Sequence, residues 1–170
     1  NTLAGFPMLL LCGLLKWIIP VRPVTTICTW ILTHIVTNWI SVNNFIFRRF
    51  LGVNLHVMGD KNLDRKGWYM VLSNHQSWVD IVVLQMVFNR RIPLLKFFIK
   101  QELIWVPLMG IAWWALDFPF MKRYKPEFLE KYPHLKGKDI EITRRACKKF
   151  KTMPVSVMNF VEGTRFNEKK

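Results

Sequence analysis

The chain has 170 residues, enough for one domain with a hydrophobic core, and 51% of them are hydrophobic, including eight Trp and thirteen Phe. A formal net charge of +14 gives a basic surface, which favours anionic lipid headgroups, phosphorylated substrates or nucleic acid as partners. The three cysteines (Cys12, Cys28 and Cys147) are odd in number and widely spaced, which argues against a disulfide framework and a zinc site. Because the sequence starts without Met and stops in a charged tail, we expect a fragment that lacks its C-terminal part.

Two apolar segments open the chain. Residues 3–19 are apolar except for Lys16 and two glycines, and Pro20 and Pro23 then break any helix. Residues 24–47 carry no formal charge and are long enough to cross a bilayer as a helix. The two segments together predict a helical hairpin.

The second segment has a polar face. Small polar side chains recur along it at spacings of three and four, namely Thr26, Thr29, Thr33, Thr37, Ser41 and Asn44. Such a stripe suits close packing of helices in lipid. We therefore expect residues 1–50 to form a membrane hairpin, spanning the bilayer or lying partly within it, with Arg48 and Arg49 at a cytoplasmic end. The alternatives are a signal peptide, disfavoured by the second segment, and a soluble hairpin, disfavoured by the long uncharged run.

After Gly52 the pattern changes to short apolar runs separated by polar turns and helical segments. Alternating strands and helices predict an α/β fold with a mainly parallel sheet flanked by helices, in a domain of residues 51–170. We expect strands over residues 53–57, 68–73, 94–99, 118–120 and 155–160, and helices over residues 77–88, 105–116 and 138–151.

A histidine and an aspartate follow the central predicted strand. Asp80 can hold the His75 ring in one tautomer, so that His75 accepts a proton, and the carboxyl end of a strand is where α/β sheets place such chemistry. The same stretch also fits a capping box, in which Ser77 and Asp80 bond free backbone N–H groups of the next helix. The spacing alone favours neither interpretation.

Further polar residues follow two later strands. Arg123 can pair with a phosphate in bidentate fashion, and Gly163 lets a ligand approach the backbone closely. Arg165 adds a second cation, and Glu162 can accept a hydrogen bond or hold Arg165 in place. Because strands of a parallel sheet end at one edge, these residues predict a phosphate pocket beside His75.

These motifs resemble the glycerolipid acyltransferase family, which includes lysophosphatidate acyltransferase. The resemblance covers residues 53–166 and rests on Asn74-His75 with Asp80, and on the later block Phe160-Val161-Glu162-Gly163-Thr164-Arg165. Residues 118–123 resemble a second family block, although bulky residues precede its arginine, and the block beyond Arg165 is missing. The sequence around the motifs is most similar to that of the bacterial inner-membrane enzymes related to YihG and of lysocardiolipin-type enzymes.

The resemblance implies a membrane-bound O-acyltransferase. It would move a fatty acyl group from acyl-CoA or acyl carrier protein to the sn-2 hydroxyl of lysophosphatidic acid, with no metal and no resident cofactor. His75 would be the general base and Asp80 its partner. The acceptor phosphate would be held by Arg123, Glu162, Gly163, Thr164 and Arg165. The implied location is a bacterial inner membrane, with the catalytic domain facing the cytoplasm.

Several alternatives stay open. The acceptor could instead be lysophosphatidylglycerol or lysocardiolipin, and a non-catalytic protein that binds anionic membranes would also explain the charge and the hairpin. Residues 122–151 hold eleven basic and four acidic residues, a net charge of +7 that suits an anionic lipid or the acidic acyl carrier protein. No nucleic-acid partner is expected, because the aromatic residues lie in apolar runs.

Overall fold

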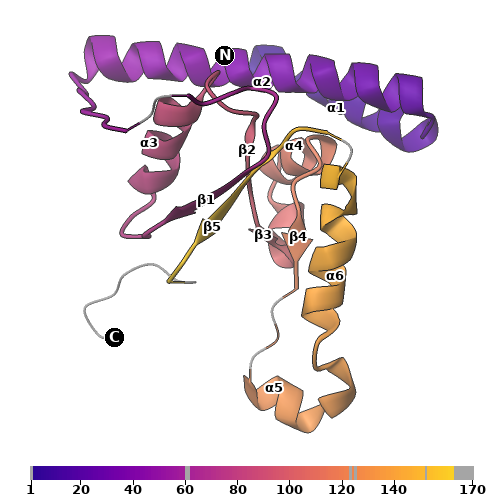
Figure 1. Ribbon diagram of the computed structural model, residues 1–170. Coiled ribbons are helices and arrows are strands. Elements are labelled where there is room, and N and C mark those ends of the chain that lie inside the picture. The colour runs from indigo at the N-terminus through magenta and orange to yellow at the C-terminus, as the bar shows by residue number, and fades with distance from the viewer. Residues whose placement is uncertain (1, 60–61, 123, 125, 152, 163–170) are drawn as a thin grey trace.

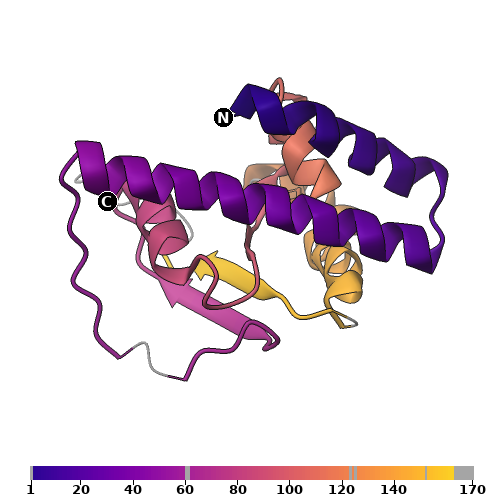
Figure 2. The ribbon, with the colours of Figure 1, turned by 90° about the horizontal axis from the view of Figure 1, so that it is seen from above.

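The computed structural model describes residues 2–59, 62–122, 124, 126–151 and 153–162. Two long helices, α1 (Thr2–Ile18) and α2 (Arg22–Phe50), pack side by side as a hairpin along one side of the molecule (Figures 1 and 2). The turn between them contains Pro20, and Pro23 stands in the first turn of α2, where its missing N–H costs nothing.

The expectation of a membrane span is not met. Within the described residues, no helix combines the length and the apolar character needed to cross a membrane.

A three-stranded parallel sheet forms the centre of the α/β unit. Its order is β1 (Tyr69–Ser73), β5 (Ser156–Phe160) and β2 (Leu95–Phe97), so the last strand lies between the first two. Ser73 at the end of β1 is in register with Phe160 at the end of β5. The helix α3 (Val79–Phe88) connects β1 to β2 and lies between the sheet and α2 (Figure 1). The predicted α/β fold with a mainly parallel sheet is confirmed.

The remaining elements form a second group. Strands β3 (Ile99–Lys100) and β4 (Phe120–Met121) pair in a separate parallel sheet, with a 3-10 helix (Gln101–Trp105) and α4 (Met109–Ala115) between them. Then follow α5 (Pro126–Lys131), α6 (Lys138–Ala146), and two 3-10 helices at Pro133–Leu135 and Cys147–Lys151.

The predicted helices over residues 105–116 and 138–151 are shorter in the structure, as α4 and α6, and two predicted strands differ more. Residues 53–57 form no strand, and β1 lies at the edge of the sheet, with β5 as its partner among the described strands. The predicted strand over residues 94–99 is split between two sheets as β2 and β3. The prediction missed α5, a short helix in a polar segment without apolar periodicity.

The hydrophobic core joins the hairpin to the α/β unit. Its buried members come from α1 and α2, from the strands and α4, and from the loops beside them: Cys12, Cys28, Leu32, Ile92, Leu95, Phe97, Ile99, Ala115, Leu116, Phe118 and Met158. Close approach requires glycine at Gly110, where a Cβ atom would lie 1.9 Å from the backbone oxygen of Ile104. The hairpin is therefore packed into the core of the α/β unit.

Candidate functional site

The loop that leaves β1 carries the two residues singled out in the sequence. His75 lies two residues beyond the strand, and Asp80 is in the first turn of α3. The His75 Nδ1 atom lies 3.1 Å from Asp80 Oδ2, within hydrogen-bond distance. The sequence spacing therefore does bring the imidazole and the carboxylate together.

One oxygen of Asp80 accepts three hydrogen bonds. Besides His75, the backbone N–H groups of Gln76 and Ser77 donate to Asp80 Oδ2, at 2.7 and 2.8 Å. The bond from Ser77 and then the bond from His75 hold the pKa of the Asp80 carboxyl below its ordinary value. Asp80 is thus ionised at neutral pH and oriented by its own loop.

The contact with Asp80 defines the chemistry of the imidazole. An ionised carboxylate accepts the Nδ1 proton, so the lone pair of neutral His75 is on Nε2. The His75 ring stacks on Phe160, with ring centroids 3.9 Å apart and ring planes 14° apart. This stacking fixes the plane of the imidazole, while the bond to Asp80 fixes the direction of Nδ1. Its side chain is 13% exposed, and that of Asp80 is 26% exposed. The ring is held firmly and still reached by solvent.

Ser77 shows that the two interpretations of this stretch are compatible. Its hydroxyl oxygen accepts the backbone N–H of Val79 at 3.0 Å, as a residue at the start of a helix does. Trp78, directly before α3, makes no side-chain capping bond, so the two Ser77 bonds, to Val79 and to Asp80, hold the start of α3 and aim Asp80 back at His75. The capping geometry and the pair of side chains are parts of one arrangement.

The end of β5 lies next to the His75 loop. Parallel pairing brings Ser73 and Phe160 together, and the backbone N–H of Val161 donates to the Ser73 carbonyl at 3.2 Å. Glu162 follows and is exposed. The sequence analysis did not assign Phe160 a role as the stacking partner of His75; its position just before the Glu-Gly-Thr-Arg block was the available signal.

The other predicted phosphate ligands cannot be located. Arg123, Gly163, Thr164 and Arg165 lie outside the described residues. The strand β4, which precedes Arg123, belongs to the smaller sheet with β3 and not to the sheet that carries His75. Among the residues that the structure describes, no group of three or more His, Cys, Asp or Glu side chains is arranged to hold a metal ion.

Known proteins match this chain in sequence. It is 28% identical over 141 residues to "1-acyl-sn-glycerol-3-phosphate acyltransferase" of Saccharomyces cerevisiae, covering 82% of this chain and 42% of the yeast protein. It is also 28% identical over 115 residues to "1-acyl-sn-glycerol-3-phosphate acyltransferase alpha" of Homo sapiens, covering 67% of this chain and 36% of the human protein. The chain thus spans less than half the length of these relatives.

A solved structure matches the fold. The crystal structure of the 1-acyl-sn-glycerophosphate acyltransferase PlsC from Thermotoga maritima superposes with a TM-score of 0.56 at 18% identity, covering all of this chain and 66% of PlsC. The family model described as Acyltransferase matches residues 54–170, which is more than half of the sequence. The chain therefore belongs to the Acyltransferase family.

Proposed function

We propose that the protein transfers a fatty acyl group from an acyl thioester to the sn-2 hydroxyl of 1-acylglycerol-3-phosphate. The observation that carries the proposal is the 3.1 Å contact between His75 Nδ1 and Asp80 Oδ2, which leaves Nε2 as the basic nitrogen. The names of the relatives point to the same acceptor, because they act on 1-acyl-sn-glycerol-3-phosphate.

In the proposed reaction, His75 Nε2 takes the proton of the acceptor hydroxyl as its oxygen attacks the thioester carbonyl. The ionised Asp80 stabilises the imidazolium that forms. The tetrahedral intermediate then collapses, the carbon–sulfur bond breaks, and the imidazolium returns its proton to the leaving thiolate. The products are 1,2-diacylglycerol-3-phosphate and a free thiol, carried on coenzyme A or acyl carrier protein, and no covalent intermediate on the enzyme is needed.

We assign the acceptor phosphate to Arg123, Glu162, Gly163, Thr164 and Arg165. Glu162 follows β5 next to the His75 loop, and Gly163, Thr164 and Arg165 come after it in the sequence. Arg165, with Arg123, would neutralise the phosphate, so that its binding positions the hydroxyl near His75. A place on the lysocardiolipin-type branch of the family stays a prediction.

We further propose that the hairpin lies on the surface of a membrane. Both helices carry large apolar side chains that are exposed, including Leu11, Trp17 and Ile18 on α1 and Ile27, Trp30, Phe45 and Phe50 on α2. Exposed apolar side chains on packed helices favour the boundary between lipid headgroups and acyl chains. In this arrangement a lysolipid would reach the enzyme from the bilayer.

The test is acyl transfer by the His75→Ala variant, with lysophosphatidate, lysophosphatidylglycerol and lysocardiolipin as acceptors and both kinds of thioester as donors. Removing the general base should lower kcat by about 10²–10⁴-fold. Sedimentation with lipid vesicles should be unchanged, because His75 lies in the loop after β1 and not on the hairpin.

His56→Ala is the matched control, since His56 is exposed in the segment between α2 and β1. It should keep full activity. Transfer by His75→Ala within tenfold of the wild type would refute the proposed base. If the wild type transferred an acyl group to none of these acceptors, the proposed acyltransferase activity would be refuted, and a protein that only binds lipid would be favoured. If the wild type preferred another lysolipid, the proposed acceptor would change and the proposed mechanism would stand.

A further inference from the structure

A basic hollow lies at the opposite edge of the sheet from His75. It has a volume of about 560 Å³ and is open to solvent, between residues 62–66, which precede β1, and residues 90–91, which precede β2. The described side chains that line it include four cations (Arg65, Lys66, Arg90 and Arg91) and one carboxylate, Asp64. Because both segments lead into parallel strands, the hollow is at the amino edge of the sheet, whereas His75 follows the carboxyl end of β1.

The first wall of the hollow is a structured turn. Asp64 Oδ1 accepts the backbone N–H of Lys66 at 3.0 Å, and the Asp64 carbonyl accepts the N–H of Gly67 at 3.2 Å. The backbone N–H of Asp64 donates to the Tyr69 hydroxyl at 2.7 Å. The only described carboxylate in the lining is thus bonded within its own turn, which fixes the backbone there, and the four cations outnumber it, so the described lining has a net positive charge.

The second wall is attached to α2. Arg90 has a φ of 63°, a left-handed conformation that costs a non-glycine residue energy, and its side chain reaches α2. Arg90 Nε donates to Ser41 Oγ at 3.0 Å, and Nη2 donates to Asn38 Oδ1. These bonds use two of the five N–H donors of the guanidinium.

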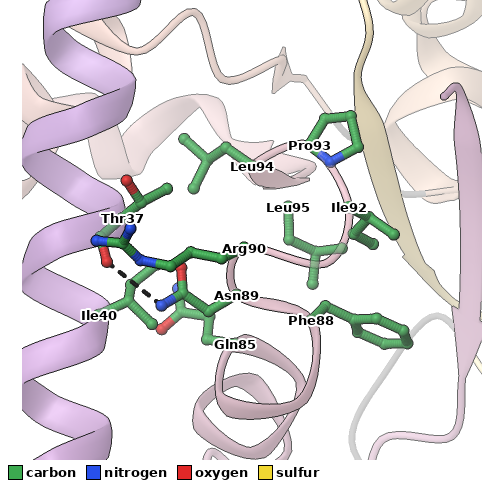
Figure 3. A pocket seen from close by; sticks show the side chains of 10 residues that line it. All are labelled: Thr37, Ile40, Gln85, Phe88, Asn89, Arg90, Ile92, Pro93, Leu94 and Leu95. Atoms are coloured by element: carbon green, nitrogen blue, oxygen red, sulfur yellow. Dashed lines mark hydrogen bonds between the residues drawn. The ribbon is translucent and has the colours of Figure 1, made fainter. Parts of the chain in front are cut away.

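The neighbouring residue strengthens this attachment. Asn89 Nδ2 donates to Ser41 Oγ at 2.9 Å and to the Thr37 carbonyl at 3.3 Å. Figure 3 shows Asn89 and Arg90 reaching toward Thr37 on α2, beside a narrow cavity that Arg90 also lines. The polar stripe of α2 therefore bonds the end of α3 in this region, and the hollow is held at a fixed position relative to the hairpin.

These observations select a ligand class. Four cations around a concave surface suit a phosphate. The described lining contains no aromatic ring on which a nucleotide base could stack. The hollow is fastened to α2, whose later turns expose Phe45 and Phe50. A phosphate that belongs to a lipid fits this combination better than a free one, because the apolar side chains and the cations can then contact the same bilayer.

We propose that this hollow binds the phosphate of an anionic phospholipid headgroup and so orients the α/β unit on the membrane. The proposal rests on the membrane association proposed above and is independent of the chemistry at His75. Binding at the amino edge of the sheet would leave the carboxyl edge, with His75, for the reaction.

The test is binding to vesicles of phosphatidylcholine alone and of phosphatidylcholine with phosphatidylglycerol, measured by sedimentation. Arg65→Gln/Lys66→Gln removes two charges from the hollow, and both side chains are exposed. Lys136→Gln/Lys138→Gln is the matched control, with the same charge change at exposed positions outside the lining. The first variant should lose about tenfold in affinity for the anionic vesicles, and the control should change it by less than threefold.

Each other outcome overturns the proposal. Equal losses in both variants would mean that net charge, and not this hollow, attracts the membrane. Unchanged vesicle binding with reduced transfer from acyl carrier protein would make the hollow a dock for that acidic protein. If the protein bound both kinds of vesicle equally, and inorganic phosphate displaced it from them, the hollow would be a site for the free anion. Acyl transfer in detergent, measured in parallel, tests the reaction separately.

Discussion

At the scale of single residues, one carboxylate oxygen organises the candidate site. Asp80 Oδ2 accepts three hydrogen bonds from a loop of five residues, and one of the donors is the imidazole of His75. A loop that satisfies a carboxylate with its own backbone keeps that carboxylate charged without a neighbouring cation. The same bonds fix the position of the loop and the direction of the ring.

Asp80→Asn should therefore lower kcat and change how the free energy of unfolding depends on pH in the acid range. Loss of the charge that stabilises the imidazolium should reduce transfer by about 10²–10⁴-fold. The pKa of Asp80 in the folded protein lies below its ordinary value of 3.8, so its stabilisation is fully present above that value and is lost as the pH falls through the folded pKa. The stability difference between wild type and variant should be constant above about pH 5 and shrink at lower pH.

Urea unfolding at a series of pH values measures this difference. Asp64→Asn is the control, because that carboxylate bonds only within its exposed turn among the contacts described. A stability difference that grows as the pH falls would contradict the assigned sign. An unchanged kcat in Asp80→Asn would show that the carboxylate has no part in the reaction.

At the scale of elements, an ion pair connects the hairpin to the α/β unit. Lys16 on α1 pairs with Asp117 in the turn after α4, and its ammonium also donates to the Ala115 carbonyl at 3.0 Å. The two side chains are only 12% and 10% exposed. In the sequence, Lys16 is the one charge within an apolar run, and the structure gives that charge a partner 101 residues away.

Lys16→Met should destabilise the protein by about 3 kcal/mol, because it removes one partner of an ion pair whose side chains are only 12% and 10% exposed. A double-mutant cycle with Asp117→Asn measures the coupling, which should be about 1–3 kcal/mol. Asparagine suits this position, since Asp117 has a φ of 57°.

Lys151→Met, at an exposed position, is the matched control and should change the free energy of unfolding by less than about 0.5 kcal/mol. Additive effects of the two substitutions in the cycle would show that the pair does not hold the hairpin in place.

At the scale of the whole molecule, the hairpin belongs to the hydrophobic core. Leu32 on α2 is fully buried, and Cys12 and Cys28 are buried beside residues of the sheet and α4. A Cβ atom at Gly13 would lie 2.9 Å from the Ala115 Cβ, so α1 approaches α4 closely. The predicted boundary between residues 1–50 and 51–170 thus falls between two parts that share one core.

Residues 51–170 produced without the hairpin should fail to unfold cooperatively. The deletion exposes the apolar partners of α1 and α2, and each fully buried leucine such as Leu32 is worth about 1.5–3 kcal/mol. Circular dichroism during urea titration checks this, with the whole chain as the reference. A shortened chain with the same transition midpoint as the whole chain would contradict the shared core.

The sequence predicted the fold most reliably where local patterns are strong. The two long helices, β1, β5 and α3 were expected within a few residues of their observed ends. The unpaired segment over residues 53–57 and the split between β2 and β3 were not, because strand pairing depends on partners that are distant in sequence. The pair of His75 and Asp80 followed from spacing within one loop, whereas the stacking of His75 on Phe160 required β5 to lie beside β1.

By itself, the sequence determined the alternation of strands and helices and placed an imidazole and a carboxylate within one short loop, because both depend on residues close together in the chain. Only the tertiary structure decided that Lys16 pairs with Asp117, that the polar stripe of α2 bonds the end of α3, and that four cations from two loops surround one hollow. These arrangements join segments about 25 to 100 residues apart, and chain folding, not local pattern, brings such segments together.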